Sequence, residues 1–145
     1  MKAVIQRVTR AEVRVDGAVV GRIRNGYVVL LGVERGDRDD AADALAAKSA
    51  KLRIFRSENR PIDRNILDAG GAALVISQFT LCGDVRKGNR PSFVSAAEPA
   101  EANRLYERYC DALRGHGVPV ETGRFGATME VELVNDGPVT LTLEA

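Results

Sequence analysis

The side chains that could attack an ester or amide bond are few in this chain: Ser77, Thr80, Cys82 and Cys110. Covalent catalysis by any of them needs a nearby base, and His116 is the only histidine. His116 stands between two glycines in RGHGVP, a loop-like stretch in which a lone histidine is usually a solvated surface residue. Ser77, in ISQ, also lacks the flanking glycines that expose a nucleophilic serine. A catalytic triad is therefore disfavoured.

Metal and cofactor chemistry is not indicated either. One histidine and two well-separated cysteines cannot form a conventional zinc shell, and no glycine-rich phosphate loop is present. The two cysteines also lack the close spacing of a redox pair. We expect no metal, no cofactor and two reduced, partly buried thiols.

The stretch SQFT, residues 77–80, ends an apolar run (ALVISQF, 73–79) and precedes an irregular connection, LCGDVRKGNRPSF. Backbone amides and short polar side chains emerge into pockets at such places. Two interpretations stay open. In the first, Ser77 and Thr80 only satisfy local hydrogen bonds where the strand ends. In the second, they and the N–H groups around Phe79 bind a carbonyl oxygen that becomes an oxyanion.

Basic residues gather in the same connection, at Arg86, Lys87 and Arg90. A second group follows the first predicted helix: Lys51, Arg53, Arg56, Arg60 and Arg64. Such residues form a solvated face with neighbouring acids, or they contact a phosphate backbone. Their position beside SQFT favours a nucleic acid end as substrate. Phe125 and Met129 would flank a base in that hypothesis, and would belong to the core otherwise.

The elements that must position these residues form one domain, because 145 residues with 45% hydrophobic composition suffice for one core. Alternating patterns predict strands at 3–15 and 18–23 around an Asp-Gly turn, and apolar runs predict strands at 27–33 and 73–79. Helices are predicted from the acidic residues at 37, 39 and 40 to about residue 52, and from Pro99 to Gly115.

The last strands are expected in VPVETGRF and in a hairpin over 129–143, with NDGPVT (135–140) at its corner. The whole chain, 1–145, is then an α+β domain. We expect a mixed, largely antiparallel sheet that curls toward a partial barrel, with two main helices.

Charge gives no bulk argument about nucleic acid, since 21 basic and 20 acidic residues leave a formal charge of +1. No apolar run is long enough for a signal peptide or a membrane span. We expect a cytoplasmic protein without membrane contact.

Four segments together resemble the D-aminoacyl-tRNA deacylases over nearly the whole chain: AVIQRV (3–8), SQFTL (77–81), KGNRPSF (87–93) and TGRFGATMEVELVNDGPVT (122–140). That family pairs Ser-Gln-Phe-Thr-Leu with Asn-x-Gly-Pro-x-Thr, and this chain carries the second motif as Asn135, Gly137, Pro138 and Thr140. A related deacylase group has Pro-Gln-Ala-Thr in the first motif and Thr before the second, unlike Ser77, Phe79 and Asn135 here.

The resemblance implies hydrolysis of the ester in D-aminoacyl-tRNA, and of glycine mischarged on tRNA. It implies a cis peptide between Gly137 and Pro138 and a homodimer in which this turn reaches into the partner's pocket. There the turn would exclude L-amino acids, with Arg7 holding it in place. Asn135 and Thr140 belong to the same implied substrate-binding motif.

The resemblance also implies a chemistry without a protein nucleophile. Ser77, Gln78 and the backbone N–H groups of Phe79 and Thr80 would orient the ester, while the 2′-hydroxyl of the terminal ribose assists water. Phe125 and Met129 would border the adenine of the 3′-terminal adenosine, and Arg86, Lys87 and Arg90 would contact tRNA. Two alternatives stay open: an esterase that uses Thr80 or Ser77 as nucleophile, and a non-catalytic module that binds the tRNA end.

Overall fold

Strand β1 (Lys2–Val15) pairs with three other strands of a six-stranded sheet in the computed structural model, which describes all residues 1–145. The first half of β1 pairs with β3 (Gly26–Gly32), and its second half pairs with β2 (Ala18–Ile23). Its other edge pairs with β6 (Glu130–Glu144). These three pairings are antiparallel, whereas β3, β4 (Ala72–Ser77) and β5 (Val120–Thr122) are parallel neighbours. The sheet is therefore mixed.

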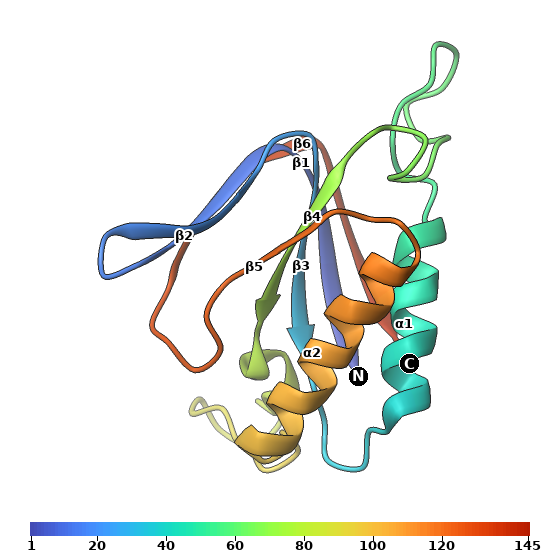
Figure 1. Cartoon of the computed structure of the whole chain (residues 1–145). Helices are drawn as coiled ribbons and strands as arrows, with labels where there is room; N and C mark the ends of the chain where they lie inside the picture. The colour runs from blue at the N-terminus through green and yellow to red at the C-terminus, as the bar shows by residue number, and fades with distance from the viewer.

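The sheet curls until its two ends approach each other. Figure 1 shows the β1–β2 hairpin bending across to the side of β5. A side chain on Gly21 of β2 would place its Cβ 2.5 Å from the carbonyl oxygen of Thr122 in β5, so only glycine fits there. The predicted partial barrel, α+β class and two main helices are confirmed.

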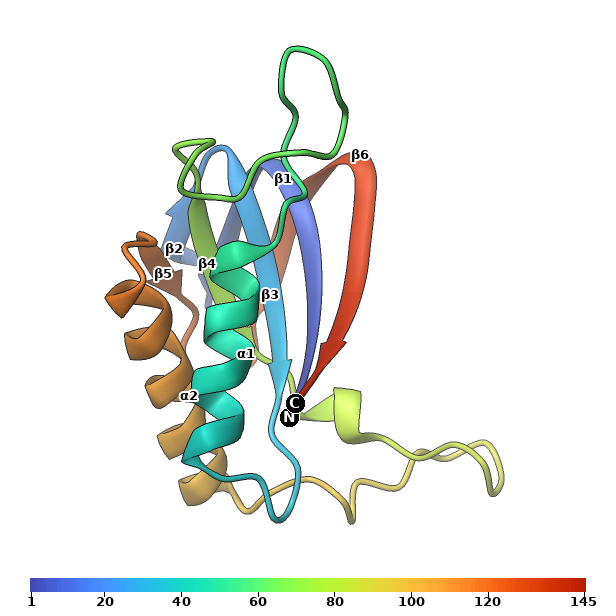
Figure 2. The same cartoon turned by 90° about the vertical axis from the view of Figure 1, so that its right-hand side faces the viewer.

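Helices α1 (Asp39–Lys51) and α2 (Pro99–Gly115) lie side by side on one face of the sheet (Figures 1 and 2). Ion pairs link them along their exposed faces, including Arg104 to Asp39 at 2.8 Å and Arg108 to Asp43 at 2.7 Å. Helix α1 has Asp39 and Asp40 in its first turn, as the acidic residues predicted, while the carboxylate of Asp37, just before the helix, accepts the Glu34 N–H at 2.7 Å.

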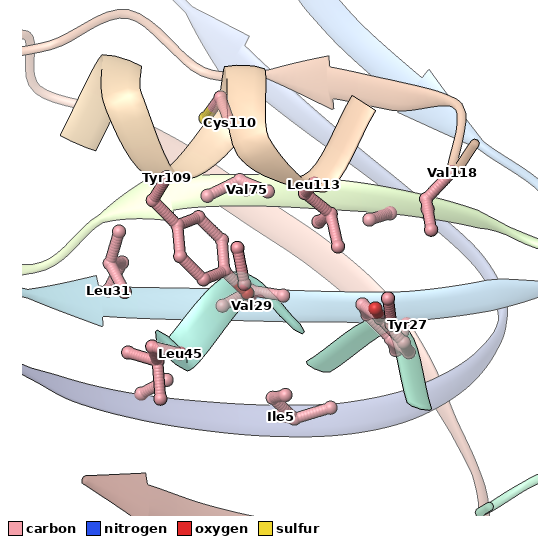
Figure 3. Close-up of a cluster of buried hydrophobic side chains, with 14 of the residues drawn as sticks. Ile5, Tyr27, Val29, Leu31, Leu45, Val75, Tyr109, Cys110, Leu113 and Val118 are labelled. Carbon is pink, nitrogen blue, oxygen red and sulfur yellow. The ribbon is translucent and has the colours of Figure 1, made fainter. Parts of the chain in front are cut away.

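The core lies between the helices and the sheet (Figure 3). Tyr109 of α2 points toward Leu45 of α1 and the apolar side chains of β3. Two buried tyrosine hydroxyls reach Ser49 of α1: Tyr109 donates to its Oγ at 2.8 Å and Tyr27 to its carbonyl oxygen at 3.1 Å. These bonds fix α1 against α2 and β3. Both cysteines are free and buried, as expected.

The hairpin predicted over 129–143 is wrong. Residues 130–144 form one strand, β6, whose two halves both pair with β1. The register jumps from Gln6–Thr140 to Val8–Asn135, so residues 136–139 form a bulge opposite Arg7. Alternation on both sides of NDGPVT is the same for a hairpin and for a strand that leaves its partner and returns, and the sequence pattern cannot separate them.

Two other predicted strands are shorter in the structure. Strand β4 ends at Ser77, and Phe79–Cys82 form a short 3-10 helix, η1. Only Val120–Thr122 of VPVETGRF pair as a strand. None of the helices is both long and apolar enough to cross a membrane.

Candidate active site

A cavity of about 480 Å³ opens between the end of β4, the first turn of α2 and the segment before β6. Such a volume is in the usual range for a small-molecule site. Ten of its fourteen lining residues are hydrophobic, and the polar groups lie at one end, where β4 passes into η1. The lining residues from the predicted site are Ser77, Gln78, Phe79, Phe125 and Met129.

The change from strand to 3-10 helix leaves backbone donors free beside this cavity. The Gln78 N–H continues the sheet by donating to the carbonyl oxygen of Leu31 at 2.8 Å. The N–H groups of Phe79 and Thr80 follow at the start of η1, where helical geometry provides no acceptor, and neither donates in any of the turn, loop and cap hydrogen bonds of the chain. Two adjacent free amides are the donors that an oxyanion needs.

Thr80 itself lies outside the cavity lining, unlike its neighbours. Its hydroxyl oxygen accepts a hydrogen bond from the side-chain amide of Gln78, and no basic side chain contacts it. His116, at the far end of α2, is also absent from the lining. The structure therefore brings no base to a nucleophile in this cavity.

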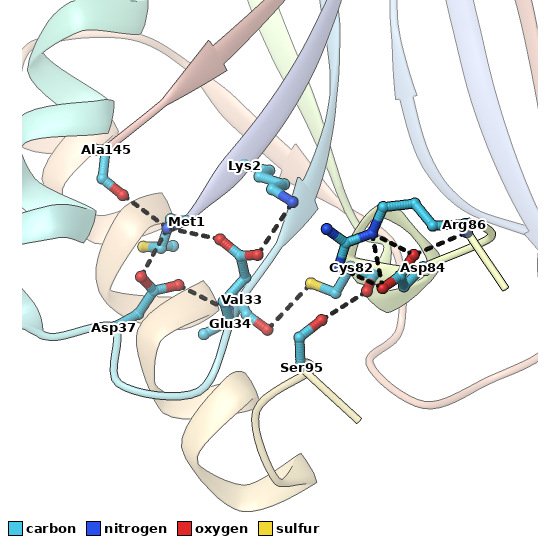
Figure 4. A network of polar contacts seen from close by, with 10 residues as sticks. All are labelled: Met1, Lys2, Val33, Glu34, Asp37, Cys82, Asp84, Arg86, Ser95 and Ala145. Atoms are coloured by element: carbon cyan, nitrogen blue, oxygen red, sulfur yellow. Dashed lines mark hydrogen bonds and ion pairs between the residues drawn. The ribbon is translucent and has the colours of Figure 1, made fainter. Parts of the chain in front are cut away.

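Contacts on both sides hold η1 in place (Figure 4). The Cys82 thiol donates to the Val33 carbonyl oxygen at 3.4 Å, and the Ser95 hydroxyl donates to the Cys82 carbonyl oxygen at 2.7 Å. The rings of Phe79 and Phe93 meet edge to face, 5.1 Å apart. Phe79 still exposes 55% of its surface, which is unusual for so large an apolar side chain.

Phe125 and Met129 come from the segment that crosses the other side of the cavity. The Phe125 ring lies 6.1 Å from that of Tyr106 on α2, and the Met129 sulfur accepts the Arg124 N–H at 3.4 Å. Both side chains are half-buried and line the cavity, so one surface of each is free for a ligand. Apolar and polarisable groups of this kind suit contact with a flat base.

The basic connection after η1 extends away from the sheet (Figure 2), and Arg86, Lys87 and Arg90 do not line the cavity. Arg86 pairs with Asp84 at 2.6 Å, and its hydrogen bonds lower the pKa of that carboxyl to about 2. Lys87 and Arg90 are exposed and make no ion pair. Their charges are thus unpaired, while that of Arg86 is engaged by Asp84.

The second predicted motif forms a separate cluster around the bulge in β6. Gly137–Pro138 is cis, the form that the resemblance implies. The Asn135 side-chain amide donates to the carbonyl oxygens of Arg7 at 2.9 Å and Val139 at 3.0 Å, and accepts from the Thr140 hydroxyl at 3.2 Å. Asn135 thereby closes the bulge and joins it to β1.

Arg7 lies beneath this bulge with only 2% of its surface exposed. Its Nε donates to the Asp136 carbonyl oxygen at 3.2 Å. Its Nη1 donates to the carbonyl oxygens of Ile54 at 2.6 Å and Pro61 at 2.9 Å, in the loop after α1. The planar guanidinium thus connects three segments, which an ammonium could not do with the same geometry.

The two motif clusters lie at opposite ends of the sheet within one chain. Arg7 pairs with Tyr27 near the start of β3, whereas Ser77 pairs with Leu31 near its end, a separation of about 13 Å along the strand. The structure therefore does not bring Gly137 and Pro138 to the cavity of the same chain.

Sequence reasoning missed two parts of these clusters. Pro99 and Ala102 line the cavity from the first turn of α2, and Ala97 lines it from the segment just before that helix. Pro99 had marked that turn, but its place over the cavity depends on how α2 crosses the sheet. The second omission is the pairing of Arg56 with Asp136, described below; these residues are distant in sequence, and no local signal connects them.

A family model, individual protein sequences and solved structures each match this chain over nearly its whole length. The model of the family described as D-Tyr-tRNA(Tyr) deacylase matches residues 4–144. A D-aminoacyl-tRNA deacylase of Ruegeria pomeroyi is 58% identical over 144 residues, which cover 99% of each chain. One of Thermus aquaticus is 55% identical and covers 100% of this chain and 95% of that protein.

Two solved structures have the same fold. The c-Myc DNA unwinding element binding protein superposes with a TM-score of 0.93 at 38% identity, covering 100% of this chain and 99% of that one. A probable eukaryotic D-amino acid tRNA deacylase superposes with a TM-score of 0.82, covering 99% and 98%. Its 19% identity restricts that likeness to the fold.

Proposed function

The chain belongs to the D-Tyr-tRNA(Tyr) deacylase family, and from this membership we propose that it hydrolyses the ester of D-aminoacyl-tRNA, releasing the D-amino acid and tRNA. It is a carboxylic ester hydrolase. The observation that carries the proposed chemistry is the pair of free amides at Phe79 and Thr80 beside Ser77 and Gln78 at the mouth of an apolar cavity.

The amides stabilise the charge that develops on the ester carbonyl oxygen, while Ser77 and Gln78 orient the ester. Removing one donor of such a site costs about 10²–10³ in rate, so two donors supply a large part of the catalysis. An aminoacyl ester is already reactive, and the neighbouring 2′-hydroxyl of the ribose assists the attack of water. No side chain is acylated, which fits a Thr80 hydroxyl without a base.

The chirality of the substrate is selected by the bulge in β6, which we name the Gly-Pro turn (residues 136–139). In a homodimer, the turn of one subunit enters the cavity of the other and blocks the position that an L side chain would occupy. A D-amino acid presents hydrogen there, as does glycine, so glycine on tRNA is also hydrolysed. Exclusion by a clash rejects the wrong substrate more strongly than a lost apolar contact does.

Two features support the dimer. The turn and the cavity lie at opposite ends of one chain, so only a second copy joins them. Strand β6 pairs only with β1 and leaves a long free edge, along which Val134 and Leu141 are exposed. Free edges and exposed apolar side chains of this kind are normally covered by a partner.

The terminal adenosine of tRNA occupies the cavity in this proposal. Its adenine lies between Phe125 and Met129, and the phosphates before it run past Lys87 and Arg90 at the rim. The substrate is a cytoplasmic one, and we place the enzyme there.

The direct test is to incubate the purified protein with D-tyrosyl-tRNA and L-tyrosyl-tRNA in parallel and to follow ester loss. We expect rapid loss of the D ester with the L ester spared. If both esters survive while tRNA binds, the protein is a module that binds the tRNA end. If both are lost at the same rate, the proposed chiral selection is wrong.

The shared site has its own test. A variant with an altered cavity, Gln78→Ala, and a variant with an altered turn, Gly137→Val, should each lose most activity as homodimers. A refolded mixture should regain part of it, because heterodimers join one intact cavity to one intact turn. No recovery in mixtures shown to contain heterodimers would contradict a site built across the interface.

A further inference from the structure

Asp136, the first residue of the Gly-Pro turn, lies between two arginines. One carboxylate oxygen, Oδ2, is 3.3 Å from Nε of Arg7 and 2.5 Å from Nη1 of Arg56. Its backbone carbonyl oxygen also accepts from Nε of Arg7. Both the main chain and the side chain of Asp136 are therefore held, directly before Gly137.

Arg56 belongs to the loop 53–64, which we name the arginine loop. A two-residue bridge between Phe55 and Arg64 closes its base, and the same loop supplies the Ile54 and Pro61 carbonyl oxygens that accept from Arg7. Figure 2 shows this loop at the same end of the sheet as the bend in β6. The loop thus reaches the turn through the buried Arg7 and through the half-exposed Arg56.

The charges favour this arrangement. Burial lowers the pKa of Arg7, and the nearby Arg56 lowers it further, while Asp136 opposes both effects. The Arg56 guanidinium in turn lowers the pKa of Asp136. Two like charges share one carboxylate, so Asp136 stays ionised and the two guanidinium groups stay close to it.

We propose that Arg56 is a positioning residue for chiral selection: through Asp136 it fixes the Gly-Pro turn against the arginine loop. This inference rests on the proposed function. A filter that works by a clash depends on where the blocking atoms lie, and errors near 1 Å alter rates strongly. Without Arg56, the turn has fewer contacts on its outer side, and an L-amino acid meets a less rigid obstacle.

The expected effect of removing Arg56 follows from the exposure of its ion pair with Asp136. Arg56 exposes 52% of its side chain and Asp136 exposes 20%, so the pair is partly screened by solvent. Pairs of this type contribute a factor of about two to five to an equilibrium. We expect Arg56→Gln to lower the ratio of D to L hydrolysis by about that factor, mainly through kcat.

The test compares Arg56→Gln with Arg56→Lys and with a matched control, Arg53→Gln. Arg53 lies in the same loop and pairs with Asp63, away from the turn. We expect a lowered ratio in Arg56→Gln, partial recovery in Arg56→Lys and the wild-type ratio in Arg53→Gln. An RNA-contact role for Arg56 would instead raise KM equally for both esters and leave the ratio unchanged, which would overturn the proposal.

Hydrogen exchange gives a measurement that needs no activity. The amides of residues 136–140 should exchange faster in Arg56→Gln than in the wild type or Arg53→Gln. If the wild type discriminates D from L esters, and Arg56→Gln changes neither the exchange rates nor the ratio, the role of Arg56 is rejected while the proposed function is not. A wild type that hydrolyses neither ester would reject the proposed function, while faster exchange would still show that Arg56 holds the turn.

Discussion

Arg7 donates a hydrogen bond to the carbonyl oxygen of Asp136 at 3.2 Å, although 129 positions separate the two residues in sequence. The guanidinium is almost completely buried, and its Nη1 donates to the carbonyl oxygens of Ile54 and Pro61. One side chain therefore fixes the distance between β1, the arginine loop and the Gly-Pro turn. We therefore expect both the stability of the fold and the proposed chiral selection to depend on this group.

Arg7→Met should destabilise the fold, because it leaves the Ile54 and Pro61 carbonyl oxygens without their donor. Each such carbonyl costs about 1–3 kcal/mol, so the free energy of unfolding should fall by at least about 2 kcal/mol. Urea denaturation measures this loss. Arg22→Met is a suitable control, since Arg22 is exposed on β2 and pairs with Glu12. Equal stability of the two variants would contradict a structural role for the buried guanidinium.

Gly137→Ala should disturb the turn through both contact and backbone conformation. The added Cβ would lie 2.8 Å from Nη2 of Arg7 and 3.0 Å from Cγ2 of Val139, at a φ of +120° that L side chains rarely adopt. Strain of this kind costs about 1–3 kcal/mol. Because a displacement near 1 Å can cost about 10² in rate, we expect D-aminoacyl-tRNA hydrolysis to fall at least about tenfold.

Gly17→Ala provides the control for Gly137→Ala. Gly17 has a φ of +78° in the β1–β2 turn, and no atom lies within 4 Å of an added Cβ. It carries backbone strain without contact at the site, so hydrolysis should stay unchanged. If Gly137→Ala hydrolyses D esters and rejects L esters as the wild type does, steric exclusion by the turn is wrong.

Local patterns in the sequence predicted most elements of the fold. Acidic residues before an alanine-rich run indicated α1, Pro99 and Gly115 bounded α2, and a nearly continuous apolar run indicated the central strand β3. These patterns report only on neighbouring residues. They could not predict which distant strands pair: whether residues 130–144 pair with each other or with β1 is decided by a partner more than a hundred residues away.

The candidate site likewise contains residues that local patterns predicted and contacts that only the fold creates. Ser77, Thr80 and the N–H groups around Phe79 were found because they end a buried strand, and the structure places Ser77 and Phe79 at the cavity but leaves Thr80 outside its lining. The role of Gln78 came from family resemblance. The bond from Arg7 to Asp136 followed no local rule; the role of Arg7 came from family resemblance. Arg56 was visible only as one of several basic residues, because its partner is set by the fold of the arginine loop.

Thr80→Ala separates a protein nucleophile from RNA-assisted hydrolysis. The Thr80 hydroxyl bonds to Gln78 and has no base beside it, so its removal should reduce kcat/KM only a few-fold, by loosening Gln78. Steady-state kinetics on D-tyrosyl-tRNA measures the change. Abolished turnover in Thr80→Ala, together with an acyl-enzyme detected in the wild type by mass spectrometry, would establish Thr80 as the nucleophile.

RNA-assisted hydrolysis predicts a different result for the substrate. A tRNA that ends in 2′-deoxyadenosine lacks the assisting hydroxyl and should slow the wild type about 10²–10⁴-fold.

Tyr109→Phe should affect stability without affecting hydrolysis. It removes a buried hydrogen bond of 2.8 Å to Ser49 while keeping the ring that packs between α1 and the sheet. We expect a loss of about 1 kcal/mol in the free energy of unfolding, measured in urea. Kinetic constants should match those of the wild type, because Tyr109 does not line the cavity. Altered selectivity in this variant would mean that the helix pair influences the site.

The stability that Asp136 contributes should depend on pH in a defined direction. Arg56, and to a lesser degree Arg7, hold the pKa of Asp136 below its ordinary value. The folded protein therefore keeps this carboxylate ionised at a pH where the unfolded chain, with a pKa of about 3.9, already binds a proton. The stabilisation is complete above the pKa of the unfolded chain and is lost as the pH falls through the pKa of the folded protein.

Asp136→Asn removes this titration and should isolate it. The difference in the free energy of unfolding between wild type and Asp136→Asn should be constant from about pH 8 to pH 5 and should shrink below about pH 4. Urea denaturation at a series of pH values measures the difference, and titrations common to both proteins cancel. A difference that grows as the pH falls would mean that the folded pKa is raised, and the carboxylate would then not be the counter-ion of the two arginines.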